Sequence, residues 1–321
     1  MDNYLQMVED ALRALPYDRQ PLRLYEPVKY ELSLGGKRIR PVLMLMAYHI
    51  YKENPQDIMM QALGLETYHN YTLLHDDLMD RAEIRRGKPC VHKVWDDNTA
   101  ILSGDTMLVL AYRYMAQCAD DKLPAVMRLF TETALEIGEG QQYDMLFETR
   151  MDVTEDEYIE MIRLKTSVLL ACALRMGAML ADAPEADAQA LYAFGENLGL
   201  AFQLQDDYLD VYGDEKVFGK RIGGDILCNK KTYMLINALL RADARQRQEL
   251  DDWLSRATYD EAEKIAAVTR LYDEMHIAAL AQAKMEQYYQ RALQWLDKVA
   301  VSDERKAELR AVADALMKRQ K

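Results

Sequence analysis

Helical hydrophobic periodicity runs through almost the whole chain, and it constrains the fold more than any other feature of the sequence. Apolar residues recur every three to four positions along long stretches, which is the pattern of amphipathic helices. We find no run that alternates between apolar and polar residues and is bounded by turns, as a half-buried strand would be. With only 14 glycines and 8 prolines in 321 residues, loops must be few or short. The sequence therefore predicts a nearly all-α protein.

The periodic stretches predict helices over most of the chain. We expect them at Asn3–Leu15, Pro21–Ser33, Arg38–Lys52, Asp57–Asp80, Trp95–Cys118, Leu123–Glu148, Thr154–Leu180, Ala186–Tyr212, Lys230–Arg241, Ala244–Leu254, Tyr259–Ala292 and Asp303–Lys318. Thr154 and Glu157 have the spacing of a capping box. No linker, low-complexity tract or change in composition divides the chain, so we expect one large helical domain over residues 1–321.

Charge and targeting signals exclude several classes of protein. The chain has 40 basic and 53 acidic residues and a formal charge of −13, which argues against a nucleic-acid-binding surface. The longest nearly uncharged apolar stretches, Pro41–Tyr51 and Val168–Leu174, are shorter than the roughly 18 residues of a membrane span. The N-terminal segment is acidic, unlike a targeting peptide, and the four cysteines lie far apart without zinc-ligand spacing. We expect a cytosolic protein with no membrane span.

The most informative segment is Leu73–Gly87, LLHDDLMDRAEIRRG, which places three aspartates at the end of an expected helix. Asp76 and Asp80 are four residues apart, with Asp77 beside them, so their carboxylates should converge on one side. Such a cluster is self-repulsive and opposes the helix dipole, and a cation would remove both penalties. Carboxylate oxygens shared with phosphates and water suit Mg²⁺. The alternative is a solvated acidic helix end.

A second acidic motif, FQLQDDYLDVYGD, contains Gln203, Asp206, Asp207 and Asp210. Their spacing of i, i+3, i+4 and i+7 forms one stripe along a helix. This stripe is polar although the flanking residues are apolar. Two carboxylate faces on separate long helices can oppose each other across a bundle and hold metal ions between them. A chance pair of solvated faces is the alternative.

Basic residues near these motifs indicate an anionic substrate. Arg85 and Arg86 follow the first motif, and Gly35–Pro41, GGKRIRP, sets three cations at a turn made flexible by glycine. Lys220 and Lys230 follow the second motif. Arginine matches phosphate oxygens in a bidentate geometry, while nucleotide-binding glycine motifs are absent from the sequence. Each cation alone is most simply a surface charge, but as a set they suggest diphosphate binding.

These motifs occur in the order GGKRIRP, LLHDDLMD with its trailing RR, GQQYD, KT at Lys165–Thr166, FQLQDDYLD and the spaced FGK, GGD and NKKT. From about Gly35 to Thr232, the sequence resembles the trans-isoprenyl diphosphate synthases, or polyprenyl synthetases. The resemblance implies a single all-α bundle around a central active-site cavity, usually in a homodimer. It also implies Mg²⁺-assisted condensation of isopentenyl diphosphate with dimethylallyl, geranyl or farnesyl diphosphate.

The resemblance also implies a role for each matching residue. Three Mg²⁺ ions per site would be bound directly by Asp76, Asp80 and Asp206, with support from Asp77, Asp207 and Asp210. The allylic diphosphate would be held by Arg85, Lys165, Thr166, Gln203, Lys220 and Lys230. Isopentenyl diphosphate would be held by Lys37, Arg40, His69 and Arg86. Among these residues, the catalytic ones would be Asp76, Asp80, Asp206, Lys165 and Lys220. A lone helix histidine is more often structural, but His69 lies two helical turns before Asp76.

Product length should depend on the residues that close the active-site cavity, which lie before the first motif on the same helix. In this family the growing chain extends back along that helix, where Tyr71 and Tyr68 lie roughly 7.5 Å and 12 Å from Asp76 along the axis. Thr72 is small, and the first motif has no insertion. We therefore expect geranylgeranyl diphosphate (C20) first and farnesyl diphosphate (C15) second. Both tyrosines would then be cavity-floor residues and core residues at once.

Two departures from the family pattern and two alternative functions remain. Cys90 stands where threonine is usual, and Asn229 replaces a usual glycine before Lys230. A class I terpene cyclase shares the chemistry but binds one diphosphate, which would leave Lys37, Arg40 and His69 unexplained. A non-catalytic subunit of a heteromeric synthase would be expected to have lost aspartates, whereas all six are present.

Overall fold

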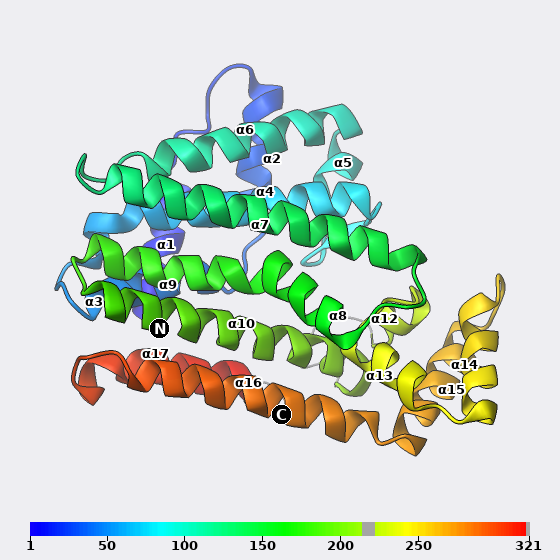
Figure 1. The fold of residues 1–321 in the computed structure, drawn as a ribbon. Helices are drawn as coiled ribbons and strands as arrows, with labels where there is room; N and C mark the ends of the chain where they lie inside the picture. The colour runs from blue at the N-terminus through cyan, green and yellow to red at the C-terminus, as the bar shows by residue number, and fades with distance from the viewer. Residues whose placement is uncertain (214–221, 319–321) are drawn as a thin grey trace. The chain divides into compact units, whose positions relative to one another are not determined.

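Helices account for nearly all of the regular structure, as the periodicity predicts. The structure is a computed structural model, and it describes residues 1–213 and 222–318. In this part of the chain the strands are limited to one two-stranded hairpin, so the prediction of an all-α fold is confirmed (Figure 1). The chain forms two compact units. The first unit comprises Met1–Thr131, Cys172–Tyr192 and Val301–Leu309, and the second comprises Glu132–Ala171, Ala193–Ala300 and the chain from Arg310 onward.

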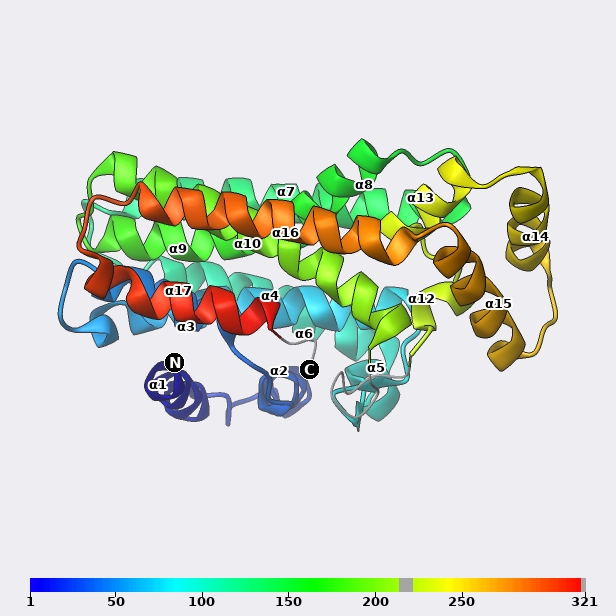
Figure 2. The same ribbon diagram turned by 90° about the horizontal axis from the view of Figure 1, so that it is seen from below.

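The first unit is built around two long neighbouring helices, α4 and α6, which run side by side in both ribbon views (Figures 1 and 2). Its elements are α1 (Asp2–Arg13), α2 (Leu22–Ser33), α3 (Ile39–His49), the 3₁₀ helix η1 (Pro55–Ile58), α4 (Met59–Met79), β1 (Ile84–Arg85), β2 (Lys88–Pro89), α5 (Val91–Val94) and α6 (Asp97–Met115). Helix α3 is buried over most of its length, from Pro41 to Tyr48. Its apolar side chains therefore anchor the glycine turn that precedes it.

The second unit contains the remaining helices, of which four also contribute residues to the first unit. The shared helices are α7 (Leu123–Thr149), α9 (Val168–Leu180), α10 (Glu185–Tyr212) and α17 (Asp303–Met317). The others are α8 (Glu155–Ile162), the π-helix η2 (Arg163–Ser167), α12 (Gly224–Leu227), α13 (Tyr233–Arg241), α14 (Ala244–Ser255), α15 (Glu261–Glu274) and α16 (Ile277–Asp297). Helices α14 and α15 pack side by side (Figure 2).

Local sequence signals explain several helix ends. The predicted capping box is confirmed, because the Thr154 hydroxyl accepts from the Glu157 amide and the Glu157 carboxylate accepts from the Thr154 amide. One predicted helix is wrong in its continuity, because Tyr259–Ala292 is broken where His276 has a φ of +57°. The stretch Thr154–Leu180 is helical without a break from Glu155 onward, but it includes the π-helix η2.

The β1–β2 hairpin was not predicted from the hydrophobic pattern. Ile84 pairs with Pro89 and Arg85 with Lys88, which leaves Arg86 and Gly87 as a two-residue loop. Both loop residues have positive φ, +53° and +77°, as a type I′ turn requires. Strands of two residues are too short to show an alternating pattern, so only the turn chemistry could have indicated them.

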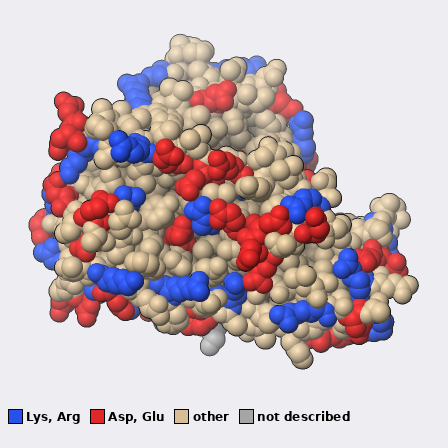
Figure 3. All heavy atoms as spheres, viewed as in Figure 1, with Lys and Arg blue, Asp and Glu red and all other residues tan. Residues whose placement is uncertain are grey.

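The surface carries both signs of charge. On the face shown in Figure 3, acidic and basic side chains lie among one another, with uncharged residues between them. Within the described residues, no helix is both long enough and apolar enough to cross a bilayer.

Candidate active site

The first aspartate motif lies at the end of α4, and its three carboxylates sit at different depths. Asp77 is buried, with 3% of its surface exposed. Asp76 is half-buried, and Asp80, which caps the C-terminus of α4, is exposed. The Asp80 amide donates to the carbonyl of Asp76 (2.8 Å), so the last helical turn is closed between the first and third aspartates.

The Asp77 carboxylate is held by an arginine from the hairpin. Arg85 Nε donates to both oxygens of Asp77 at 3.0 Å, and its terminal nitrogen makes a further contact. This is a charge-assisted, bidentate pair. The hairpin thus fixes Arg85, which we predicted to hold the allylic diphosphate, against the middle aspartate of the motif.

Of the three cations in the glycine turn, Arg38 is a structural residue. It is 3% exposed and has a φ of +47°. Its guanidinium donates to Glu9 (2.8 Å), Glu66 (2.7 Å) and the carbonyl of Leu32 (2.5 Å). Arg38 therefore ties the turn to α1, α2 and α4 and leaves Lys37 and Arg40 as the candidate ligands.

Arg40 and His69 meet directly, as two residues of one predicted site should. The distance from Arg40 Nη1 to His69 Nε2 is 3.1 Å. Burial, followed by the charges of Arg40 and Arg86, lowers the pKa of His69 well below its ordinary value. His69 is therefore neutral, and because Arg40 can only donate, Nε2 accepts and Nδ1 carries the proton. The remaining N–H groups of both side chains are donors of the kind that an anion accepts from.

Arg86 joins this group through the glycine turn. Its guanidinium donates to the carbonyl of Gly35, and a Cβ on Gly36 would lie 2.9 Å from the guanidinium carbon. Gly36 also has a φ of +136°, so the backbone conformation requires glycine there, and a larger residue would in addition displace the Arg86 guanidinium. The turn therefore brings Arg86 beside the loop that carries Lys37, which is exposed.

The first unit also contains a buried carboxylate that we did not predict. Glu31 on α2 has no exposed surface, and neither of its oxygens has a hydrogen-bond partner among the described residues. Burial, followed by the charge of Asp77, raises its pKa to about 7 despite the opposing effect of Arg85. No pattern in the sequence distinguishes this residue from Glu26, the other acid of α2.

Cys90, one of the two departures from the family pattern, lies near Asp77 of the first aspartate motif. It is fully buried at the start of α5. Burial, followed by the charge of Asp77, raises its pKa to about 12. It is therefore a neutral thiol beside the motif.

The two tyrosines predicted to limit product length belong to an aromatic cluster. The ring of Tyr68 is buried, and its centroid lies 5.5 Å from that of Tyr71 and 5.2 Å from that of Phe130. Tyr112 packs against Phe130 at 4.9 Å, and Tyr71 against His75 at 4.9 Å. The sequence did not indicate Phe130 and Tyr112, because they come from other helices, α7 and α6.

The second aspartate motif lies on α10, where Asp207 is buried and Asp206 half-buried. Tyr158 donates to Asp207, and Gln203 Nε2 donates to the same carboxylate (3.2 Å). Burial, followed by the charge of Asp225, raises the pKa of Asp207 to about 8. Tyr158 belongs to α8 and carried no signal in the sequence.

The Lys165–Thr166 motif lies in the π-helix η2. Such turns are frequent at functional sites. Neighbouring glycines let other helices approach it closely: a Cβ on Gly140 of α7 would lie 2.3 Å from the amide nitrogen of Lys165, and one on Gly199 of α10 would lie 2.7 Å from the Cα of Ser167. Both positions therefore require glycine, and α7 and α10 pack directly on the turn.

The π-helix orients both of its candidate ligands. Lys165 Nζ donates to Asp144 (2.6 Å), the last residue of the GQQYD motif. Although burial opposes its ionisation, the charges of Lys165 and Lys230 lower the pKa of Asp144. Thr166 Oγ1 donates to Gln203 Oε1 (3.3 Å). The second unit thus brings together the predicted residues Lys165, Thr166, Gln203 and Asp207.

Asp210 links the second motif to the loop that carries Lys230. Its carboxylate accepts from the amide of Asp225 (2.9 Å), and its carbonyl accepts from Gly223 (2.6 Å). Lys230 is exposed and follows α12. Lys220 lies outside the described residues.

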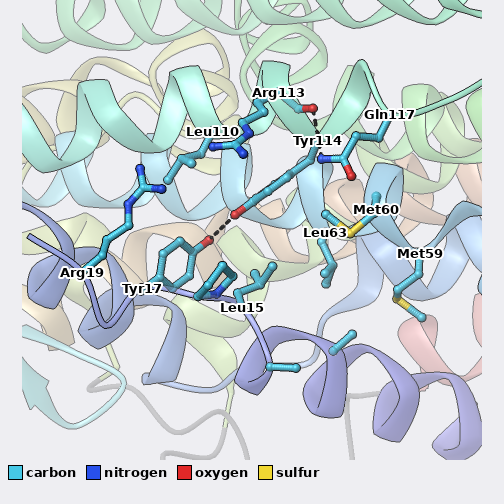
Figure 4. A pocket seen from close by; sticks show the side chains of 13 residues that line it. Leu15, Tyr17, Arg19, Met59, Met60, Leu63, Leu110, Arg113, Tyr114 and Gln117 are labelled. Atoms are coloured by element: carbon cyan, nitrogen blue, oxygen red, sulfur yellow. Dashed lines mark hydrogen bonds between the residues drawn. The ribbon is translucent and has the colours of Figure 1, made fainter.

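A separate cavity of about 460 Å³ opens in the first unit, at the other end of α4 (Figure 4). Its walls include Leu63, Met59 and the hydrogen-bonded hydroxyls of Tyr17 and Tyr114 (3.1 Å). Leu63 precedes Asp76 by thirteen residues, which is about 20 Å along the helix axis. The cavity is therefore distinct from the aspartate motif on α4.

Comparison with known proteins decides the family. A model of the polyprenyl synthetase family matches residues 21–272. The chain belongs to the polyprenyl synthetase family. The family predicted from the motif order is therefore confirmed.

Related proteins and a solved structure extend the match to nearly the whole chain. A short chain isoprenyl diphosphate synthase of Methanothermobacter thermautotrophicus is 35% identical over 318 residues, which is 99% of this chain and 97% of the relative. A geranylgeranyl diphosphate synthase of Methanosarcina mazei is 41% identical over 72% of each chain. The crystal structure of a geranylgeranyl pyrophosphate synthase has a TM-score of 0.92 at 42% identity and covers 100% of this chain and 98% of its own. The polyprenyl synthetase fold is thus shared along the full chain.

Proposed function

We propose that this polyprenyl synthetase is a Mg²⁺-dependent prenyltransferase that condenses isopentenyl diphosphate with allylic diphosphates. One observation carries the proposal: both aspartate motifs are intact in a chain of this family, and each is accompanied by cationic or polar side chains suited to a diphosphate. Two related proteins are named as short chain isoprenyl and geranylgeranyl diphosphate synthases, which supports the reaction class. A cyclase is not among the relatives reported above.

The donor chemistry of the motifs fits a hard divalent cation. Both motifs offer carboxylate oxygens, and the raised pKa of Asp207 means that a positive charge beside it would restore its ionised form. Among the described residues, no three His, Cys, Asp or Glu side chains are close enough to enclose a metal ion. Mg²⁺ commonly completes its shell with water and substrate phosphates. The proposed direct ligands are Asp76, Asp80 and Asp206, supported by Asp77, Asp207 and Asp210.

Bound there, Mg²⁺ would neutralise the charge of the departing diphosphate. The chain's own residues would orient both substrates. Lys165, Thr166 and Lys230 would hold the allylic diphosphate, since the π-helix and the loop after α12 present them near Asp144 and Asp207. Neutral His69 would donate from Nδ1 to isopentenyl diphosphate while Arg40 and Arg86 supply the charge.

We further propose that the main product is C20 geranylgeranyl diphosphate. The aromatic cluster of Tyr68, Tyr71 and Phe130 supports a floor about two turns from Asp76, because these rings pack on one another and cannot move independently.

The experiment is incubation with Mg²⁺, isopentenyl diphosphate and a C5, C10 or C15 allylic primer, followed by product sizing. We expect elongation to C20, and a large loss of rate for Asp80→Asn. The matched control is Asp10→Asn, which removes an exposed carboxylate of α1 and should leave the rate unchanged. A cyclase would instead consume one allylic diphosphate without isopentenyl diphosphate, and a non-catalytic subunit would give no product by itself.

We also propose a homodimer. Helix α6 exposes Leu102 and Val109, with 59% and 68% of their surfaces accessible, and residues seven apart lie on the same helix face. A second copy could cover this face. Light scattering should give twice the chain mass, and Leu102→Asp combined with Val109→Asp should give the monomer mass. A wild-type monomer would contradict the proposal.

A further inference from the structure

The segment between α12 and α13 sets the position of Lys230. The Lys230 amide donates to the carbonyl of Asp225 (2.9 Å), and the Lys230 carbonyl accepts from the amide of Thr232 (2.8 Å). The preceding residue, Asn229, has a φ of +53°, so the backbone is in the left-handed conformation immediately before Lys230. The contacts that fix Asn229 therefore also fix the position of the Lys230 Cα.

Asn229 is tied by its side chain to two helices of the second unit. Its Nδ2 donates to the carbonyl of Leu254 at the end of α14 (3.0 Å), and its Oδ1 accepts from Lys264 Nζ of α15 (2.7 Å). Its carbonyl accepts from Lys231 Nζ (3.1 Å). Asparagine tolerates the left-handed conformation better than most residues. Glycine would adopt the same backbone but would supply neither side-chain bond.

Breaking the hydrogen bond between Asn229 and Lys264 is unfavourable because the Lys264 ammonium group is buried. It has no exposed surface and no carboxylate partner among the described residues. Its other contacts are the carbonyl of Leu227 (3.3 Å) and the ring of Tyr259 (4.2 Å). Burial lowers the pKa of Lys264, and a buried ammonium group is tolerated only where its hydrogen bonds are made. Both of its oxygen acceptors belong to Leu227–Asn229.

We propose that Asn229 and Lys264 are positioning residues that hold Lys230 in place for the allylic diphosphate. The inference rests on the proposed function for the role of Lys230. Both oxygen acceptors of Lys264 come from this loop, and Lys264 in turn supplies one of the two side-chain hydrogen bonds that hold Asn229. The replacement of the usual glycine thus adds a support that glycine could not provide.

The test compares Asn229→Gly and Lys264→Met with the wild-type enzyme. Each variant removes the Lys264–Asn229 hydrogen bond, and Asn229→Gly does so without backbone strain. Because one partner is charged, we expect kcat/KM for the allylic diphosphate to fall about tenfold. The KM for isopentenyl diphosphate should change less than twofold. The matched control is Arg270→Met on α15, whose guanidinium pairs with Glu249 and Glu274 rather than the loop; it should leave both constants unchanged.

A second measurement does not depend on activity. Hydrogen exchange at the Lys230 and Thr232 amides should be about tenfold faster in both variants than in wild type and unchanged in Arg270→Met. If Lys264→Met fails to fold, Asn229→Gly carries the test alone. If both single variants fold, the double variant should lose little more than Asn229→Gly alone, because Asn229→Gly already breaks the contact between Asn229 and Lys264.

The outcomes separate this inference from the proposed function. If wild type elongates primers but Asn229→Gly leaves the allylic kcat/KM unchanged, or raises the KM of both substrates equally, the positioning role is overturned. If wild type elongates no primer, the proposed function fails. Unchanged amide exchange in Asn229→Gly would overturn the anchoring of the loop by Asn229, whatever the activity.

Discussion

Replacing Arg38 with methionine should destabilise the protein without touching a substrate ligand. Methionine retains an unbranched apolar side chain, so the main loss is the guanidinium and its three acceptors, Glu9, Glu66 and the carbonyl of Leu32. The Glu66 side chain is 2% exposed. It would keep a bond from Asn70 (2.9 Å) but would become a buried carboxylate without its ion-pair partner.

The magnitude follows from the cost of breaking a buried ion pair from one side, which is about 3–5 kcal/mol. The unfolding entropy near the midpoint is about 2.1 cal/mol/K per residue, or about 0.7 kcal/mol/K for a chain of this length. We therefore expect Arg38→Met to lower the Tm by about 4–7 °C.

Differential scanning calorimetry near pH 7 measures this shift. The control is Arg13→Met, the same substitution in an exposed pair with Asp10, where the side chains are 68% and 60% exposed. Exposed pairs contribute about 0–1 kcal/mol, so the control should shift the Tm by less than about 1.5 °C. Combining Arg38→Met with Glu66→Met removes both buried charges, and should recover part of the loss.

Equal Tm shifts for Arg38→Met and Arg13→Met would refute the reasoning. A Tm for the double variant that equals the sum of two independent losses would also refute it, because contacting residues should not behave additively.

Three further predictions concern single side chains. Glu31 has a pKa raised from 4.5 to about 7 in the folded state, so the folded protein binds the proton more tightly than the unfolded chain, and stability present below about pH 4.5 is lost as pH rises through 7. Calorimetry of Glu31→Gln should therefore show a gain in stability over wild type that grows across this pH range to about 3 kcal/mol. A difference that stays constant with pH would contradict this prediction. Thr154→Ala removes a capping box and should cost about 1 kcal/mol, measured by urea unfolding against Thr149→Ala, which lies outside the box. Tyr71→Ala or Tyr68→Ala should lengthen the product, sized by chromatography, and an unchanged product from both would exclude the aromatic floor.

Much of the fold could be predicted because its signals are local. Hydrophobic periodicity located the long helices, and the spacing of Thr154 and Glu157 located the start of α8. The motif residues Arg40 and His69, which lie on different helices, do meet at 3.1 Å. The helix predictions depend on patterns within a few residues, which the sequence displays directly. The proximity of Arg40 and His69 was expected only from the resemblance to the family.

The rest depends on contacts between distant segments. The π-helix at Lys165 forms where Gly140 and Gly199 admit neighbouring helices, and no period in the sequence encodes that approach. Arg38 belongs to the set of cations that suggested diphosphate binding, but its acceptors come from α1, α2 and α4. Asn229 was identified only as a departure from the usual glycine, although it binds Lys264, thirty-five residues later.

The first and second aspartates differ in burial in the same way in both motifs. In each, the second aspartate is buried and is fixed by protein donors: Asp77 by Arg85, and Asp207 by Tyr158 and Gln203. Asp210, the third aspartate of the second motif, is buried as well and accepts from the amide of Asp225. In each, the first aspartate is half-buried. A carboxylate that already accepts from protein donors has fewer lone pairs to offer to a cation. The burial pattern therefore gives a physical reason why the first aspartate of each motif is the better direct ligand and the second its support.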